Sequence, residues 1–239
     1  MEKLRDTLKA ESYFQKAIEQ TESSIEKFES LISTVIETKG ADDVGVKNGY
    51  NVLVSSYTNL VNLLYSAGED LEIISKTYKK LLYYYGKMWK SDYGYFELIR
   101  MLSMGVLLEI EEKHFAELEK KIVDENFNDY LVNYLLIHID NTWQLKSDTF
   151  VFSGIYDDLK AIIEQEDTTA VQLLEEYLLK KWYSNHKDAA WYNSHKSKQD
   201  VYYGYWSYET GAIVKCMGLD DSPLKNVKYY PYDLVHYKH

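Results

Sequence analysis

The first 222 residues of the chain contain no proline, and both prolines, Pro223 and Pro231, lie near its end. Proline interrupts helices because it lacks an amide hydrogen and clashes with the preceding turn. Nearly the whole chain is therefore free to form long helices. The sequence also lacks the sustained alternation of apolar and polar residues that is typical of strands. These features predict an all-α protein.

Apolar residues in the first half recur at steps of three and four, the spacing of one helix face. The first helix is expected from Leu4 to about Glu37, with a seam made of Phe14, Ile18, Thr21, Ile25, Phe28, Ile32 and Val35. Residues 39–49 are interpreted as a loop punctuated by Gly40, Gly45 and Gly49. A second helix is expected to carry Leu53 to Leu64 and to end at Gly68. A third should begin after Glu69 and Asp70, and a fourth should run from about Tyr93 to Ile122.

Residues 123–129 read V-D-E-N-F-N-D, and we expect a domain boundary there, which separates residues 1–123 from residues 124–239. Further helices are expected at about Asn128–Leu145, Phe150–Glu164, Thr169–Trp182, Ala189–His195 and Tyr203–Met217. Gly218 should end the last of these helices, as glycine commonly does. The predicted architecture is a two-part helical bundle of about eight or nine helices, followed by an irregular aromatic tail.

The cellular setting is predicted from three features. The single cysteine, Cys216, excludes an internal disulfide and fits a reducing cytosol. The charged N-terminal stretch has no signal-peptide pattern. No apolar run reaches the roughly 18 residues of a membrane span. We therefore expect a cytoplasmic protein without a membrane partner.

The charge is uneven along the chain. The formal net charge is −11, and residues 124–176 hold 12 acidic side chains against only Lys146 and Lys160. Nucleic-acid binding generally needs a basic surface, so this charge disfavours it and favours attraction to a basic protein. Nine carboxylates are predicted to form an acidic, partner-binding face: Asp129, Asp140, Asp157, Asp158, Glu164, Glu166, Asp167, Glu175 and Glu176. In the plainer interpretation they only keep the protein soluble.

Patterns that carry catalysis are scarce. Glu111 and His114 form one E-x-x-H pair, whereas a di-iron bundle needs two such pairs and two further glutamates. Phosphate-binding and nucleophile-elbow motifs do not occur in the sequence. Cys216 is interpreted as a small core residue. We therefore predict no catalytic residues, no metal site and no cofactor.

Aromatic residues crowd the last sixty positions, and 24 of all residues are tyrosines against 7 phenylalanines. Four strings stand out: W-Y-x-x-H from Trp191, Y-G-Y-W-x-Y-E from Tyr203, G-L-D-D-S from Gly218 and Y-Y-P-Y-D-L from Tyr229. Interleaved basic and aromatic residues could stack on single-stranded nucleic acid. The structural interpretation is stronger: Gly204 would allow close approach, Tyr205 and Trp206 would fill a core, and Glu209 would serve a buried tyrosine or histidine network.

These strings resemble the C-terminal domain of the PoNi immunity proteins. The matching residues, which we interpret as structural, are Trp191, His195, Gly204, Tyr205, Trp206, Glu209, Asp220, Asp221, Tyr230, Pro231 and Asp233. The N-terminal half matches that family only in length and helicity. The resemblance implies a bacterial cytosolic immunity protein, which is not an enzyme and which binds and blocks a cognate PoNe-type DNase toxin.

Two other functions stay open at this point: a helical scaffold for another basic partner, and a metal-binding helical-bundle enzyme. The charge favours the immunity hypothesis, because a DNase must present a basic cleft to DNA and an acidic surface could occupy it. The oligomeric state has no signature in the sequence.

Overall fold

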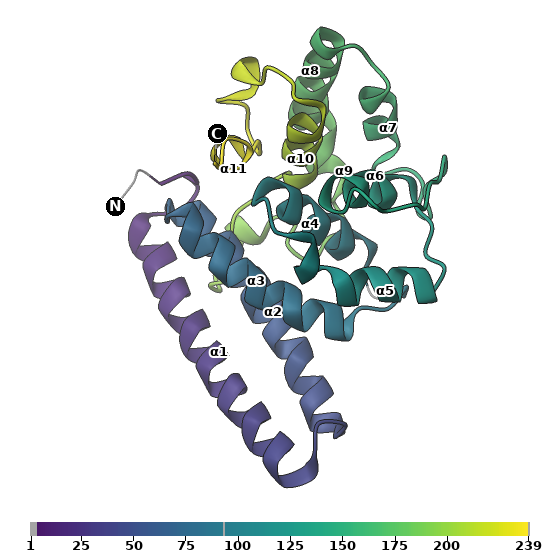
Figure 1. The fold of residues 1–239 in the computed structure, drawn as a ribbon. Coiled ribbons are helices and arrows are strands. Elements are labelled where there is room, and N and C mark those ends of the chain that lie inside the picture. Colours follow the sequence, from purple (N-terminus) through teal and green to yellow (C-terminus); the bar gives the residue numbers. More distant parts are fainter. Residues whose placement is uncertain (1–3, 93, 239) are drawn as a thin grey trace. The chain divides into compact units, whose positions relative to one another are not determined.

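The computed structural model describes residues 4–92 and 94–238. Every regular element in this part of the chain is helical, so the predicted all-α fold is confirmed. The chain forms two compact units (Figure 1). The first takes in the chain up to Lys90 together with residues 113–121 and 193–204, and the second takes in residues 91–112, 122–192 and 205–239. The division of the chain after residue 123 stays a prediction.

The first unit is built on α1 (Glu11–Lys39), α2 (Val44–Ala67) and α3 (Leu71–Met88). In Figure 1, α1 and α2 lie side by side as an antiparallel hairpin. The predicted seam of α1 buries Phe14, Ile25 and Ile32. The first helix begins later than Leu4 because Asp6 accepts a hydrogen bond from the amide of Leu8, a turn that competes with helix.

Gly45 and Gly49 correct the loop interpretation of residues 39–49. α2 already begins at Val44, capped by the Asp43 side chain, so both glycines are helical. An added Cβ at Gly49 would lie 2.5 Å from Cγ1 of Ile32, and one at Gly45 would lie 3.6 Å from Val35. The glycines therefore let α1 approach α2 closely.

The second unit has shorter helices than the sequence predicts. They are α4 (Tyr95–Leu107), α6 (Tyr130–Ile139), α7 (Asp157–Ile163), α8 (Asp167–Glu176), α9 (Tyr183–Asn185), α10 (Tyr208–Met217) and α11 (Tyr232–Val235). A π-helical turn (Tyr177–Trp182) joins α8 to α9, and Ser222–Leu224 is a 3-10 turn. Two further elements, α5 (Ala116–Asp124) and the 3-10 turn Glu112–His114, contain residues of both units, and the 3-10 turn Ser194–Lys196 belongs to the first.

Several predicted helices were wrong in extent. The helix expected from about Tyr93, a position outside the described residues, ends at Leu107 because Glu109 turns left-handed at φ 49° and Ile110 bonds back to Gly105. Residues 141–156, expected to be mostly helical, form an irregular loop. The short helix at Ala189–His195 is largely turns. α10 begins only at Tyr208, because Gly204 has a positive φ of 108°, which a right-handed helix does not allow. Gly218 does end α10, in the left-handed conformation.

Candidate interaction surface

Seven of the nine predicted carboxylates lie on α7, on α8 or in the turn between them. Glu164, Glu166, Asp167, Asp157 and Glu176 are exposed, and Asp158 and Glu175 are half-buried. The two helices pack against each other within the second unit (Figure 1). Four of these residues begin a helix: Asp157 and Asp158 in α7, and Glu166 and Asp167 in α8. Carboxylates at these positions stabilise the positive end of the helix dipole, so part of the acidity has a local structural cause.

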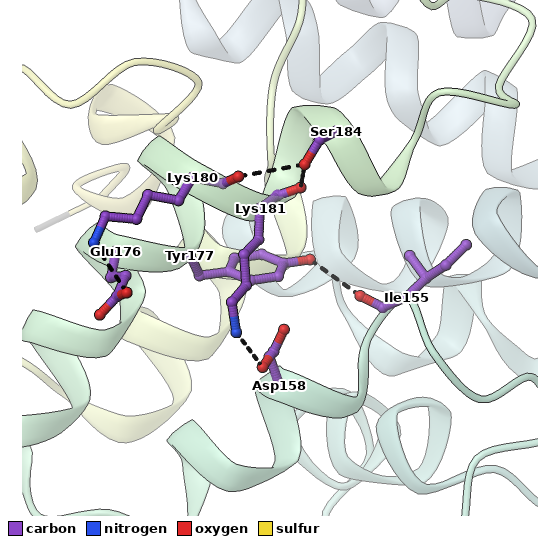
Figure 2. Close-up of polar contacts among 7 residues, drawn as sticks. All are labelled: Ile155, Asp158, Glu176, Tyr177, Lys180, Lys181 and Ser184. Carbon is purple, nitrogen blue, oxygen red and sulfur yellow. Dashed lines mark hydrogen bonds and ion pairs between the residues drawn. The ribbon is translucent and has the colours of Figure 1, made fainter.

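Lysines partly neutralise this surface. Figure 2 shows Lys181 reaching from the π-helical turn to Asp158 (Nζ–Oδ1 2.7 Å) and Lys180 bending back to Glu176 (3.1 Å). The hydrogen bond that Lys181 donates to Asp158 raises the pKa of Lys181. Lys160 lies 4.0 Å from Glu164. Such exposed pairs contribute little stability, but they reduce the negative potential of the surface.

The π-helical turn decides where these lysines lie. Tyr177 is buried, and its hydroxyl donates a long hydrogen bond to the carbonyl of Ile155 (3.5 Å), as Figure 2 shows. Burial, together with the nearby charges of Glu209 and Asp158, raises the pKa of the Tyr177 hydroxyl well above its ordinary value. Wider helical turns of this kind are rare and shift the side chains that follow them. Here the turn carries Lys180 and Lys181 to the acidic surface.

Asp129 does not belong to the acidic face, which corrects the prediction. Its side chain is 0% exposed and caps α6, and Oδ1 accepts hydrogen bonds from the amides of Leu131 and Val132. Oδ2 accepts from the hydroxyl of Tyr95 (2.9 Å) and the amide of Val151 (2.8 Å). Burial raises the pKa of Asp129, against the lowering effect of these donors. The side chain of Asp129 is buried because it caps α6 and is also covered by the loop that contains Val151.

Asp140 ends α6 instead of sharing an outward face with Asp129. Its Oδ1 accepts hydrogen bonds from the amide and the hydroxyl of Thr142, and the side chain is half-buried. The expectation that the two residues share one side of a long helix was wrong, because that helix ends at Ile139.

Glu209 organises the motif-bearing core of the second unit. The carboxylate is 5% exposed, and Oε1 accepts hydrogen bonds from the indole of Trp182 (2.6 Å) and the hydroxyl of Ser207 (2.7 Å). The partners are thus tryptophan and serine, and not the expected tyrosine or histidine. Trp182 stacks on Trp191 with centroids 5.5 Å apart, and Trp191 contacts the buried ring of Tyr205 at 5.4 Å.

Another buried carboxylate, Asp221, ties down the C-terminal segment. Its oxygens accept from the hydroxyl of Tyr230 (2.7 Å) and contact Nε2 of His236 (2.9 Å). Asp220 accepts from the amide of Ser222, which lowers its pKa. These contacts fit the predicted turn after Gly218 and a structural role for the motif.

The other motif residues are dispersed. Pro231 packs against α10 where Gly211 leaves room for its ring, and Asp233 is exposed in α11. Trp206 is half-buried. His195 belongs to the first unit and contacts the ring of Tyr202 at 6.2 Å.

Within the described ranges no cluster of three or more His, Cys, Asp or Glu side chains suits a metal ion, and Glu111 and His114 are both exposed. One cavity of about 340 Å³ is lined by Glu109, His138, Lys215 and Cys216, among others. Lys215 already donates to two carbonyls and pairs with Glu109 at 2.8 Å, and burial raises the pKa of Cys216 to about 12. This cavity therefore offers neither a free cation nor a reactive thiolate.

Comparisons with known proteins assign the family. Residues 5–120 match the family model described as PoNe immunity protein (PoNi), N-terminal, and residues 127–234 match PoNe immunity proteins (PoNi), C-terminal. The chain belongs to the PoNe immunity protein family. The resemblance of the motif strings is thereby confirmed, and membership implies an immunity protein against a polymorphic nuclease toxin, with a non-enzymatic role.

A solved structure supports the fold of this PoNi family member. The crystal structure of protein PA2201 from Pseudomonas aeruginosa matches with a TM-score of 0.71 at 19% sequence identity, over 98% of this chain and 90% of that chain. A search of curated proteins finds no match. In the part of the chain that the structure describes, no helix combines the length and hydrophobicity needed to cross a membrane.

Proposed function

We propose that this PoNi family member neutralises a cognate DNase toxin by laying the acidic surface of α7 and α8 against the toxin's basic DNA-binding cleft. The observation that carries the proposal is a set of carboxylates without a lysine partner. Within the described ranges, no ion pair joins a basic side chain to Asp157, Glu166, Asp167 or Glu175. This set is smaller than the one expected from sequence. Lysines hold Asp158, Glu164 and Glu176, Asp129 is buried, and Asp140 is half-buried just after α6.

The physical argument is electrostatic. A nuclease that grips DNA phosphates presents a positive field, and a negative surface accelerates its capture at low ionic strength. Exposed charges act mainly on the association rate, because water screens them in the final complex. We therefore expect the unpaired carboxylates to accelerate encounter more than they slow release.

The test neutralises three exposed carboxylates at once, with Asp157→Asn, Glu166→Gln and Asp167→Asn. We expect the association rate with the nuclease encoded beside the gene to fall about tenfold at low salt and to depend less steeply on salt. Stopped-flow fluorescence on the purified proteins measures both quantities. Melting curves establish that the fold is unchanged.

The matched control removes the same charge elsewhere, with Glu22→Gln, Glu26→Gln and Glu37→Gln on the exposed side of α1. Equal slowing in both variants would mean that total charge matters and not this surface. Unaltered kinetics in the α7–α8 variant would eliminate the acidic surface from the proposal. If the unmodified protein neither binds the nuclease nor protects DNA on co-expression, the proposed function itself fails.

A further inference from the structure

Three exposed apolar side chains gather near the start of α4 in the second unit, and we call them the aromatic patch: Phe96 (39% exposed), Val151 (45%) and Phe152 (53%). Single exposed apolar residues are ordinary, but several exposed apolar side chains around one buried ring form a larger apolar surface, and large apolar surfaces commonly mark interaction sites. Both phenylalanines contact the buried ring of Tyr95 in tilted geometries, with centroid distances of 6.1 Å for Phe96 and 5.1 Å for Phe152. The patch is thus the surface layer of an aromatic core.

Two members of the patch lie in the irregular loop 141–156. Loops of this length without regular structure are uncommon in compact proteins and are typically functional or disordered. This one is held at successive carbonyls: Asn128 donates to Lys146, Lys160 to Asp148 (2.7 Å) and the amide of Tyr130 to Thr149 (2.9 Å). The loop is therefore an ordered feature of the surface.

Asp129 anchors the patch from beneath. Its buried carboxylate accepts from the amide of Val151 and from the hydroxyl of Tyr95, the ring on which the phenylalanines lie. Burying a carboxylate is costly unless donors surround it, and four hydrogen bonds do so here. One buried charge thereby fixes the backbone of an exposed apolar residue. A surface held in its binding conformation loses less entropy when a partner docks.

The charges around the patch indicate the kind of partner. Residues 140–164 carry five acidic side chains against two basic ones. Of the basic pair, Lys160 is engaged with the carbonyl of Asp148 and lies near Glu164. The pKa of Tyr95 is raised mainly by burial and by Asp129, and to a smaller extent by the charge of Asp157. The exposed Asp157 therefore lies close to the patch. An apolar centre with an acidic surround fits a cationic protein surface.

We propose that the aromatic patch is the apolar centre at which this protein holds the cationic surface of its nuclease. The inference rests on the proposed function and adds a division of roles to it. The carboxylates of α7 and α8 speed encounter, whereas the patch sets the lifetime of the complex, because a few buried aromatic side chains dominate most protein interfaces.

The experiment measures dissociation of the purified complex by surface plasmon resonance for Phe152→Ala and Phe96→Ala. We expect each change to speed dissociation at least tenfold and to leave the association rate within about twofold. The matched control is Leu179→Ala, which truncates a side chain that is 58% exposed in the same unit but outside the patch. It should release the nuclease like the unmodified protein.

A second variant, Val151→Ser, removes apolar area without touching a ring and guards against misfolding of the phenylalanine variants; melting temperatures are compared for all of them. Unchanged dissociation in the three patch variants, with the charge-neutralised variant still slow to associate, would overturn this inference and leave the proposed function intact. If neither the unmodified protein nor any variant binds the nuclease, both this inference and the proposed function fail.

The patch could also be covered by a second copy of the chain. Light scattering on the free protein decides this. A dimer that Phe152→Ala converts to a monomer would overturn the inference in favour of self-association, and a mass that does not change supports it.

Discussion

In the first compact unit, α1, α2 and α3 run for 29, 24 and 18 residues, whereas α6, α7 and α8 in the second run for 10, 7 and 10. The long helices follow one repeating apolar seam and meet through small residues such as Gly49. The short helices are bounded by side chains that bond to the backbone, as Asp129 does at the start of α6 and Asp140 does just after its end. The difference teaches that apolar periodicity alone does not set helix length where side chains compete for hydrogen bonds to the backbone.

Removal of a carboxylate should give the largest contrast between the two units. Glu209→Ala leaves the indole of Trp182 and the hydroxyl of Ser207 without an acceptor in the core, and we expect a loss of about 3 kcal/mol in the free energy of unfolding. Glu29→Ala in the first unit removes the acceptor of Tyr57, but Glu29 is partly exposed and water can replace it. There we expect about 1 kcal/mol. Urea denaturation measures both, and equal losses would break the comparison.

The second contrast concerns glycine. At Gly211 an added Cβ would lie 2.7 Å from Cγ of Pro231 and 3.2 Å from Val235, and a proline ring cannot turn away. Gly211→Ala should therefore destabilise by about 2 kcal/mol despite the better helix propensity of alanine. At Gly49 the obstacles are Cγ1 and Cδ1 of Ile32, at 2.5 and 2.7 Å. Unlike a proline ring, this side chain can change rotamer, so Gly49→Ala should cost less than Gly211→Ala, about 1 kcal/mol.

The control for this pair is Gly49→Ala in an Ile32→Ala background, which lacks both Cγ1 and Cδ1 of Ile32. Suppose thermal denaturation shows that Gly49→Ala costs as much as Gly211→Ala in the unmodified protein but little in the Ile32→Ala background. The α1–α2 contact is then as rigid as the core around Pro231.

The smallest effect is a pH dependence that belongs to the second unit alone. Burial raises the pKa of Asp129 above its ordinary value of 3.8, so between these two values the folded protein binds more protons than the unfolded chain. The contribution of this carboxyl to stability is therefore present at low pH and is lost as pH rises through the folded pKa. In Asp129→Asn that slope disappears.

The measurement is the difference in free energy of unfolding between the unmodified protein and Asp129→Asn, taken from pH 4 to pH 7. We expect the value for the unmodified protein minus the value for Asp129→Asn to fall as pH rises, by at most about 1.4 kcal/mol per pH unit. A difference that grows with pH would mean that the four donors outweigh burial and lower the pKa of Asp129.

Some of the candidate site was predictable and some was not. The exposed carboxylates at Glu164, Glu166 and Asp167 follow from a charged turn between two helices, which the sequence displays directly. In the sequence Asp129 resembles these exposed carboxylates, yet it is buried by a loop whose residues lie about twenty positions further along the chain. Phe96, Val151 and Phe152 were missed because apolar residues are ordinarily assigned to the core. The run Phe150–Phe152, closed in by Asp148, Thr149, Ser153 and Gly154, was a signal for an exposed turn.

The amino-acid sequence by itself determined the all-helical class, the seam of α1, the end of α10 at Gly218 and the family. Each of these depends on residues that are neighbours along the chain or on one helix face. Tertiary structure decided which carboxylates are free, because Lys181 reaches Asp158 across 23 positions, and where α6 and α7 stop. The burial of a side chain and its pairing with a lysine depend on which distant segments of the chain come into contact, and a local sequence pattern does not contain that information.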